Sequence, residues 1–310
     1  MKRSTSWDWV ENGNEIPLNL IGFLRIFIQA IFASFILYAC SGPSPGGDTP
    51  KVTETLSVKA PPASVVQAIQ NKFPGAVSYK EGIDSLVNHL KRFGIQANKM
   101  LWGQSTCVDD ITNTKDKLMP QIKGPFNFGG LAGLPFTGIT GLDAFVHHVP
   151  EDGTAILFVA PHIGYNEKEG WGKILRHDQH HTSSCCGALV AALATLQKGE
   201  LKPKVPAQED YQEGMIVQLA FAHHSEILTS SEPILSFTQL TYREAIRQMS
   251  YYASKVKERH FKYAVIVGGI IINTDYMFTD YLWIETVSVL DIQKNTFVEG
   301  KKLFPDPERD

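Results

Sequence analysis

The chain has 310 residues, of which 43% are hydrophobic and 20% are charged, as is usual for a globular protein. This composition excludes a disordered, collagen-like or coiled-coil chain. The 32 acidic and 29 basic residues give a net charge of −3, so the chain lacks the basic surplus typical of nucleic-acid-binding proteins, and no nucleic-acid partner is expected. Four cysteines are too few for a disulfide-stabilised scaffold of this length.

The N-terminus predicts a signal or anchor segment. Residues 17–40 are mostly apolar, but Arg25 divides them and leaves residues 26–39 as the stretch without a charge. That length suits the hydrophobic region of a signal peptide and falls short of the ~20 residues of a full membrane span. The sequence LYAC that ends at Cys40 resembles a bacterial lipobox; the alternatives are a signal anchor or an extension without lipid. We therefore expect membrane attachment through residues 17–40, or targeting to a secretory compartment or an organelle.

A change of composition marks the end of this segment. Residues 41–50 read SGPSPGGDTP, which is typical of a linker without packing potential. The sequence thus predicts a signal or anchor segment with its linker over residues 1–50, and one domain over residues 55–310.

The first part of the domain predicts two helices and a strand. Apolar residues recur at helical spacing over 63–73, after Pro61, and again over 83–93, before Gly94. Residues 95–106 then predict a strand that runs into a loop at Cys107.

The remainder continues this alternation. The run TAILFVA at 154–160 is typical of a strand buried on both faces. After it the sequence predicts helices at 187–196, 211–228 and 242–257 and strands at 263–272 and 282–290. Alternating strands and helices indicate the α/β class. The Gly-rich segment at 126–140 lacks the Gly-Lys-Ser/Thr of a phosphate-binding loop.

Thiol and imidazole side chains fall where the predicted strands end and a helix begins. Cys107 follows a strand, His162 follows another, and Cys185 and Cys186 precede a helix. Ligand sites in open α/β sheets form at such places. Two cysteines and one histidine suit zinc and leave a fourth position for water, and Asp109 could orient that water. Spacing alone leaves open the alternative that these are buried core cysteines.

Five segments, in one order along the chain, resemble the limiting-CO2-inducible protein B/C family of algae, diatoms and some bacteria. They are WGQSTCVDD (102–110), FGGLAGLPFTG (128–138), AFVHHVPEDG (144–153), APHIG (160–164) and SCCGA (184–188). The resemblance implies a β-carbonic-anhydrase-like sheet flanked by helices, a Cys/His/Cys zinc site and a homodimer. It also implies a role in concentrating CO2. Some members of this family are active carbonic anhydrases and others are inactive.

The resemblance also assigns roles to individual residues. It implies that Cys107, His162 and Cys186 are the zinc ligands and that Cys185 is only a neighbour. Asp109 matches the carboxylate that β-carbonic anhydrases pair with an arginine two residues further on. That position is Ile111 here, so Arg176 is the candidate partner of Asp109.

The sequence therefore predicts a zinc enzyme that interconverts CO2 and bicarbonate, with Asp109 and Arg176 as catalytic residues. Apolar walls for a small substrate are expected from Phe126, Phe128, Leu131 and Phe136. Three alternatives remain: an inactive family member that acts as an inorganic-carbon sensor or scaffold, a zinc hydrolase with a wider pocket, and a metal-free protein with buried thiols.

Overall fold

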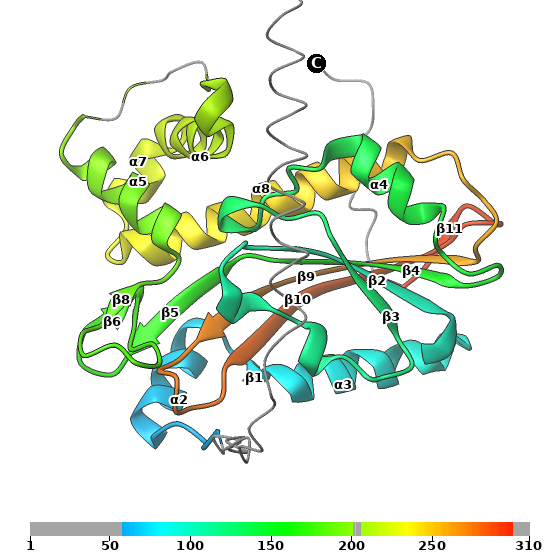
Figure 1. The fold of residues 1–310 in the computed structure, drawn as a ribbon, viewed down its shortest axis with the longest axis horizontal. Helices are drawn as coiled ribbons and strands as arrows, with labels where there is room; N and C mark the ends of the chain where they lie inside the picture. The colour runs from blue at the N-terminus through cyan, green and yellow to red at the C-terminus, as the bar shows by residue number, and fades with distance from the viewer. Residues whose placement is uncertain (1–57, 201, 203–205, 300–310) are drawn as a thin grey trace, which may run out of the picture. The chain divides into compact units, whose positions relative to one another are not determined.

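A mixed sheet forms the centre of the domain (Figure 1). The computed structural model describes residues 58–200, 202 and 206–299. Along the main path of the sheet the strands are β1 (Val77–Ser78), β10 (Tyr281–Asp291), β9 (Tyr263–Asn273), β4 (Thr154–Ala160), β2 (Met100–Thr106) and β3 (Lys123–Asn127). The expected N-terminal segment, with Arg25 and Cys40, lies outside the described residues. Within those residues, no helix is both long enough and apolar enough to cross a membrane.

The central strands are parallel and in register. Met100 lies opposite Thr154, and Thr106 lies opposite Ala160, so β2 and β4 end together. Strand β9 is parallel to β4 and extends beyond it, where β5 (His162–Asn166) pairs with the last residues of β9. Strand β10 is antiparallel to β9. The smaller strands are β6 (Gly170–Trp171), β7 (Lys173–Ile174), β8 (Ser183–Ser184) and β11 (Thr296–Glu299).

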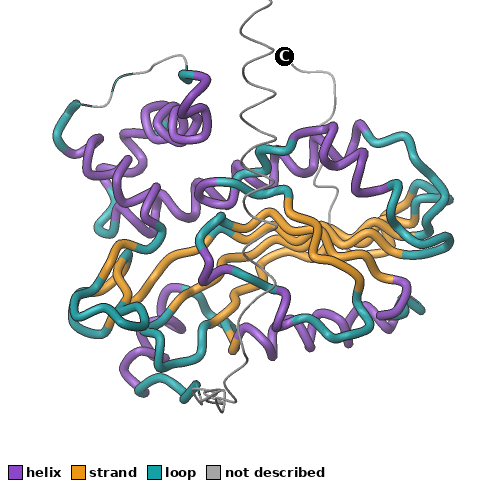
Figure 2. Tube along the Cα trace, viewed as in Figure 1, coloured by secondary structure: helices purple, strands orange, loops and turns teal. Residues whose placement is uncertain are grey.

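Both faces of the sheet are covered by helices, as the layers in Figure 2 show. Helices α2 (Ala63–Lys72) and α3 (Tyr79–Leu90) lie on one face, and α4 (Gly138–Val146) and α8 (Pro233–Lys255) lie on the other. Helices α5 (Gly187–Gln197) and α7 (His224–Thr229) pack against α8, and α6 (Tyr211–Ala222) packs against α5. Short 3-10 turns occupy Lys91–Phe93, Ala97–Lys99, Asp110–Thr112, Lys115–Lys117, Leu131–Gly133 and Gln208–Asp210.

This two-sided cover explains the continuous apolar run of β4. Successive side chains of a strand point to opposite faces. Ile156 and Phe158 pack into the core on the α3 side, whereas Leu157 and Val159 pack into the core beneath α4 and α8. All seven residues of β4 are buried, so both sets must be apolar.

The α/β class and the flanking helices predicted from the sequence are confirmed, but several element bounds differ. The helix expected at 242–257 begins earlier, at Pro233, because residues such as Leu235 and Phe237 are also buried. The helix expected at 211–228 divides at His223, which leaves the helical region at φ −116°. The strand expected at 95–106 begins only at Met100, because residues 97–99 form a 3-10 turn.

The Gly-rich segment packs against the end of β2. A Cβ atom on Gly129 would lie 2.0 Å from the backbone oxygen of Thr106 and 2.7 Å from its nitrogen. Backbone atoms cannot move away as a flexible side chain can, so only glycine fits here. The glycine therefore lets the segment approach the strand that leads into Cys107.

We expect Gly129→Ala to destabilise the protein by about 1–3 kcal/mol, the usual cost of forcing extra atoms into a packed site. Urea denaturation measures the free energy of unfolding. The matched control is Gly187→Ala in the first turn of α5, where the added Cβ meets no heavy atom within 4 Å. The control should be neutral or slightly stabilising. Equal effects of the two substitutions would contradict the close approach.

Candidate metal centre

Three elements bring thiol and imidazole groups together. Cys107 follows the last residue of β2, His162 begins β5 just beyond the end of β4, and Cys186 is the N-cap residue of α5. Their ligating atoms all lie within 4.8 Å of one another. Because β2 and β4 are adjacent and end in register, Cys107 and His162 must be neighbours in space.

The geometry of this cluster fits a divalent metal ion. The Sγ atoms of Cys107 and Cys186 are 3.9 Å apart. A disulfide would require about 2.0 Å, whereas two thiolates on a tetrahedral zinc, each at about 2.3 Å, lie about 3.8 Å apart. His162 is completely buried, and its Nε2 atom makes no hydrogen bond of acceptable geometry to any described residue. The three residues can therefore hold a metal through two sulfur atoms and one nitrogen.

The electrostatics of the cluster favour a cation. The hydrogen bond from Cys186, supported by His162, lowers the pKa of the Cys107 thiol to about 4 despite its burial. The same contact with Cys107, together with burial, raises the pKa of Cys186 well above its usual value. Burial lowers the pKa of His162, but the surrounding sulfur atoms outweigh burial and raise it well above its usual value. Negative charge thus gathers on the sulfur atom of Cys107, and thiolate is the form of cysteine that binds metals.

An ion pair lies beside this cluster. Arg176 Nη2 donates to Asp109 Oδ2 at 2.6 Å, and Arg176 Nη1 donates to Asp109 Oδ1 at 3.0 Å. Such a two-point contact is the strong geometry for arginine and a carboxylate. Burial raises the pKa of Asp109, but the contact with Arg176 outweighs burial and lowers it, so the carboxylate stays ionised. The side chains are 17% and 22% exposed, so the pair lies between the buried cluster and solvent.

Arg176 has further contacts that fix its position. Its Nη1 atom also donates to Asp110 Oδ1 at 3.1 Å, and its Nε atom donates to Ser183 Oγ at 3.2 Å. The structure thus places a cation against Asp109 although Ile111 occupies the position two residues beyond it. The catalytic and metal-binding roles of these residues remain predictions.

One residue of this site was missed in the sequence. Asn273, the last residue of β9, accepts a hydrogen bond at its Oδ1 atom from His162 Nδ1 at 2.8 Å. Its position in the sequence could have indicated a role in the site, because Asn273 is the polar residue that ends a long apolar strand. Cys185, which was expected to be a neighbour, has its Sγ atom 3.5 Å from the same nitrogen of His162.

The expected apolar walls divide into two groups. Phe128 is 1% exposed and packs against the rings of Phe126 and Phe145, so it is a core residue. Phe126, Leu131 and Phe136 are only partly buried against that core, and they remain candidates for the walls of a substrate site.

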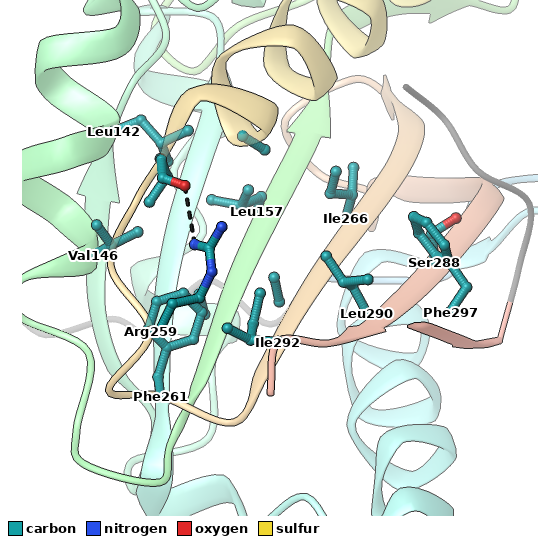
Figure 3. Close-up of a pocket in the computed structure, with 14 residues that line it drawn as sticks. Leu142, Val146, Leu157, Arg259, Phe261, Ile266, Ser288, Leu290, Ile292 and Phe297 are labelled. Atoms are coloured by element: carbon teal, nitrogen blue, oxygen red, sulfur yellow. Dashed lines mark hydrogen bonds between the residues drawn. The ribbon is translucent and has the colours of Figure 1, made fainter. Parts of the chain in front are cut away.

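A separate apolar cavity lies elsewhere in the domain (Figure 3). Its lining includes Leu157, Arg259 and Ile266. Leu157, the central residue of β4, lies opposite Ile266 of β9, away from the strand ends that carry the Cys/His cluster. This cavity includes no residue of the candidate metal centre.

Comparison with known proteins shows the family of the chain. The profile of the limiting CO2-inducible proteins B/C beta carbonic anhydrases matches residues 76–291. The chain belongs to this family. The family is thereby related to the β-carbonic anhydrases, and the matched region contains the three cluster residues together with Asp109 and Arg176.

Solved structures of the family share the fold. PtLCIB4, a homolog of the limiting CO2-inducible protein LCIB, is 24% identical with a TM-score of 0.68, over 76% of this chain and 99% of that chain. LCIB itself is 20% identical with a TM-score of 0.56, over 74% of this chain and 96% of that chain. No curated relative matches the chain in sequence.

Proposed function

We propose that this member of the family is a zinc-dependent carbonic anhydrase that interconverts CO2 and bicarbonate. The observation that carries the proposal is the convergence of the ligating atoms of Cys107, His162 and Cys186 within 4.8 Å. The relationship of the family to the β-carbonic anhydrases also supports this proposal. The donor set supports zinc, because thiolate and imidazole together suit this metal and three protein ligands leave one position open.

Each residue then has a distinct task. When bound, zinc lowers the pKa of a coordinated water to about 7 and so supplies a nucleophile for CO2. Cys107, His162 and Cys186 would hold the metal, and all three are buried, so they would shield it from bulk water. Asp109, which stays ionised, would accept a hydrogen bond from the O–H of that water and so orient the lone pair of its oxygen toward the substrate.

Arg176 acts through Asp109. By donating to both carboxylate oxygens, it keeps Asp109 charged and prevents the carboxylate from turning toward the metal. A carboxylate free to turn would occupy the open position of the metal and exclude water. The guanidinium therefore keeps the site open in place of the arginine that is missing at Ile111.

Assembly and location form the rest of the proposal. A homodimer is the expectation that comes with the family. The apolar residues 17–40 and the linker after them support export of the protein or its attachment to a membrane. An enzyme held at one location in this way would contribute to concentrating CO2 there.

The first prediction concerns zinc content. The purified protein should hold about one zinc per chain, as one tetrahedral site requires. Cys107→Ser, His162→Ala and Cys186→Ser should each lose the zinc, because each removes one of three ligands. Cys185→Ala is the matched control and should retain it. Elemental analysis measures this, and zinc loss in the control with retention in Cys186→Ser would move the ligand by one residue.

The second prediction concerns catalysis. Asp109→Asn should keep zinc and lower CO2 hydration by roughly 10²-fold or more, the scale of a lost acid/base group. Arg176→Ala should have a similar effect. Asp110→Asn is the control and should remain near the wild-type rate, because this side chain is 88% exposed and an asparagine oxygen can still accept the hydrogen bond from Arg176 Nη1.

Exchange of ¹⁸O between CO2 and water measures these rates. A wild-type rate in Arg176→Ala would contradict the ion-pair assignment and leave the zinc site intact. A zinc-loaded wild-type protein without any exchange would contradict the enzymatic proposal and favour an inorganic-carbon sensor or scaffold.

The third prediction concerns the N-terminus. Deletion of residues 1–50 should leave a zinc-loaded and active protein, because all the site residues lie in the domain beyond it. The full-length chain should partition with membranes or be cleaved near Cys40. Cell fractionation with mass analysis of the N-terminus tests this, and an unprocessed full-length chain in the soluble fraction would contradict it.

A further inference from the structure

We propose that Asn273 is the positioning residue of the metal centre: it fixes the tautomer of His162 and joins that histidine to the loop that carries Cys107 and Asp109. The inference rests on the proposed metal site for its functional meaning. Its structural content, the state of one imidazole ring, can be measured without any metal.

The two ring nitrogens of His162 have different surroundings. Nδ1 lies 2.8 Å from Asn273 Oδ1, and both side chains are buried, at 0% and 1% exposed. An amide oxygen only accepts hydrogen bonds, so Nδ1 must carry the proton. In the neutral ring Nε2 then has a free lone pair, and this buried atom has no hydrogen bond to any residue that the structure describes. The contact with Asn273 therefore prepares the ring to bind a metal through Nε2.

The orientation of the Asn273 amide follows from its other contact. Its Nδ2 atom donates to the backbone oxygen of Ile111 at 3.4 Å. A backbone carbonyl cannot donate, so the NH2 group must face Ile111 and the oxygen must face His162. The reversed amide would place its oxygen against the carbonyl oxygen of Ile111, and these are two acceptors.

This side chain also links two parts of the site. Asn273 is held in β9, opposite Gly164 of β5, the strand that begins with His162. Ile111 lies in the 3-10 turn for which Asp109 is the N-cap residue. One amide thus connects the strand of the histidine ligand to the turn behind Cys107 and Asp109.

The contact between Asn273 and His162 also explains why Cys185 is not a ligand. Its Sγ atom lies 3.5 Å from Nδ1 of His162 and donates to Asn273 Oδ1 at 3.6 Å. Cys185 therefore faces the protonated nitrogen of the ring, and it is not one of the three residues whose ligating atoms cluster.

The tautomer is tested first, in the metal-free protein. Long-range ¹H–¹⁵N spectra of histidine-labelled protein, with His162 assigned by comparison with His162→Gln, should show the Nδ1–H form at a pH where the ring is neutral. Asn273→Leu, which has a similar volume and no acceptor, should lose this preference. A wild-type His162 protonated on Nε2 would overturn the proposal, whether or not Asn273→Leu folds.

Zinc affinity is tested second, by competition with a chelator. Asn273→Leu should weaken zinc binding about 10–100-fold, the usual effect of losing the hydrogen-bond partner of a ligand histidine. The paired change Asn273→Asp with Asp280→Asn should restore most of the affinity, because it returns an acceptor to Nδ1 without adding charge beside the buried Asp280.

The matched control is Asn166→Ala. Asn166 is also buried and lies in β5 with His162, but its amide binds Asp275. The control should keep the wild-type affinity. A folded Asn273→Leu protein with wild-type affinity and an unchanged tautomer would overturn the proposal. If the wild-type protein bound no zinc at all, the proposed function would fail, while the tautomer measurement would still decide the role of Asn273.

Discussion

The parallel register of β2, β4 and β9 is the constraint on which the site depends. Thr106 and Ala160 are paired, so the residues that follow them, Cys107 and Pro161-His162, leave the sheet side by side. Strand β9 continues past β4 and pairs with β5, which carries Asn273 to the far side of His162. A shift of one residue in any of these pairings would turn these side chains to opposite faces.

Burial and charge divide the site into two layers. Cys107, His162 and Cys186 are at most 7% exposed, and ionised groups in such surroundings are costly unless they have partners. Each contacts the others, and a divalent cation would satisfy the remaining lone pair on His162. The charges of Asp109 and Arg176 lie further out, where they neutralise each other and keep contact with water. The inner layer suits metal binding, and the outer layer suits control of a polar nucleophile.

The sequence predicted best what depends on local pattern. Strand 154–160 and helix 187–196 were foreseen because their apolar runs reflect burial along the chain itself. The three cluster residues were assigned through family resemblance, since their spacing alone did not distinguish a site from core thiols. Asn273 was not foreseen because its partner His162 is 111 positions away, and only the tertiary pairing of β5 with β9 brings them together.

The most direct test of the account is X-ray absorption at the zinc edge on the zinc-loaded protein. The account predicts two sulfur neighbours at about 2.3 Å and two nitrogen or oxygen neighbours at about 2.0–2.1 Å, from two cysteines, one histidine and one open position. Three sulfur neighbours would make Cys185 a ligand, and a shell of nitrogen and oxygen alone would place the zinc away from the cluster; either result would contradict the proposed centre.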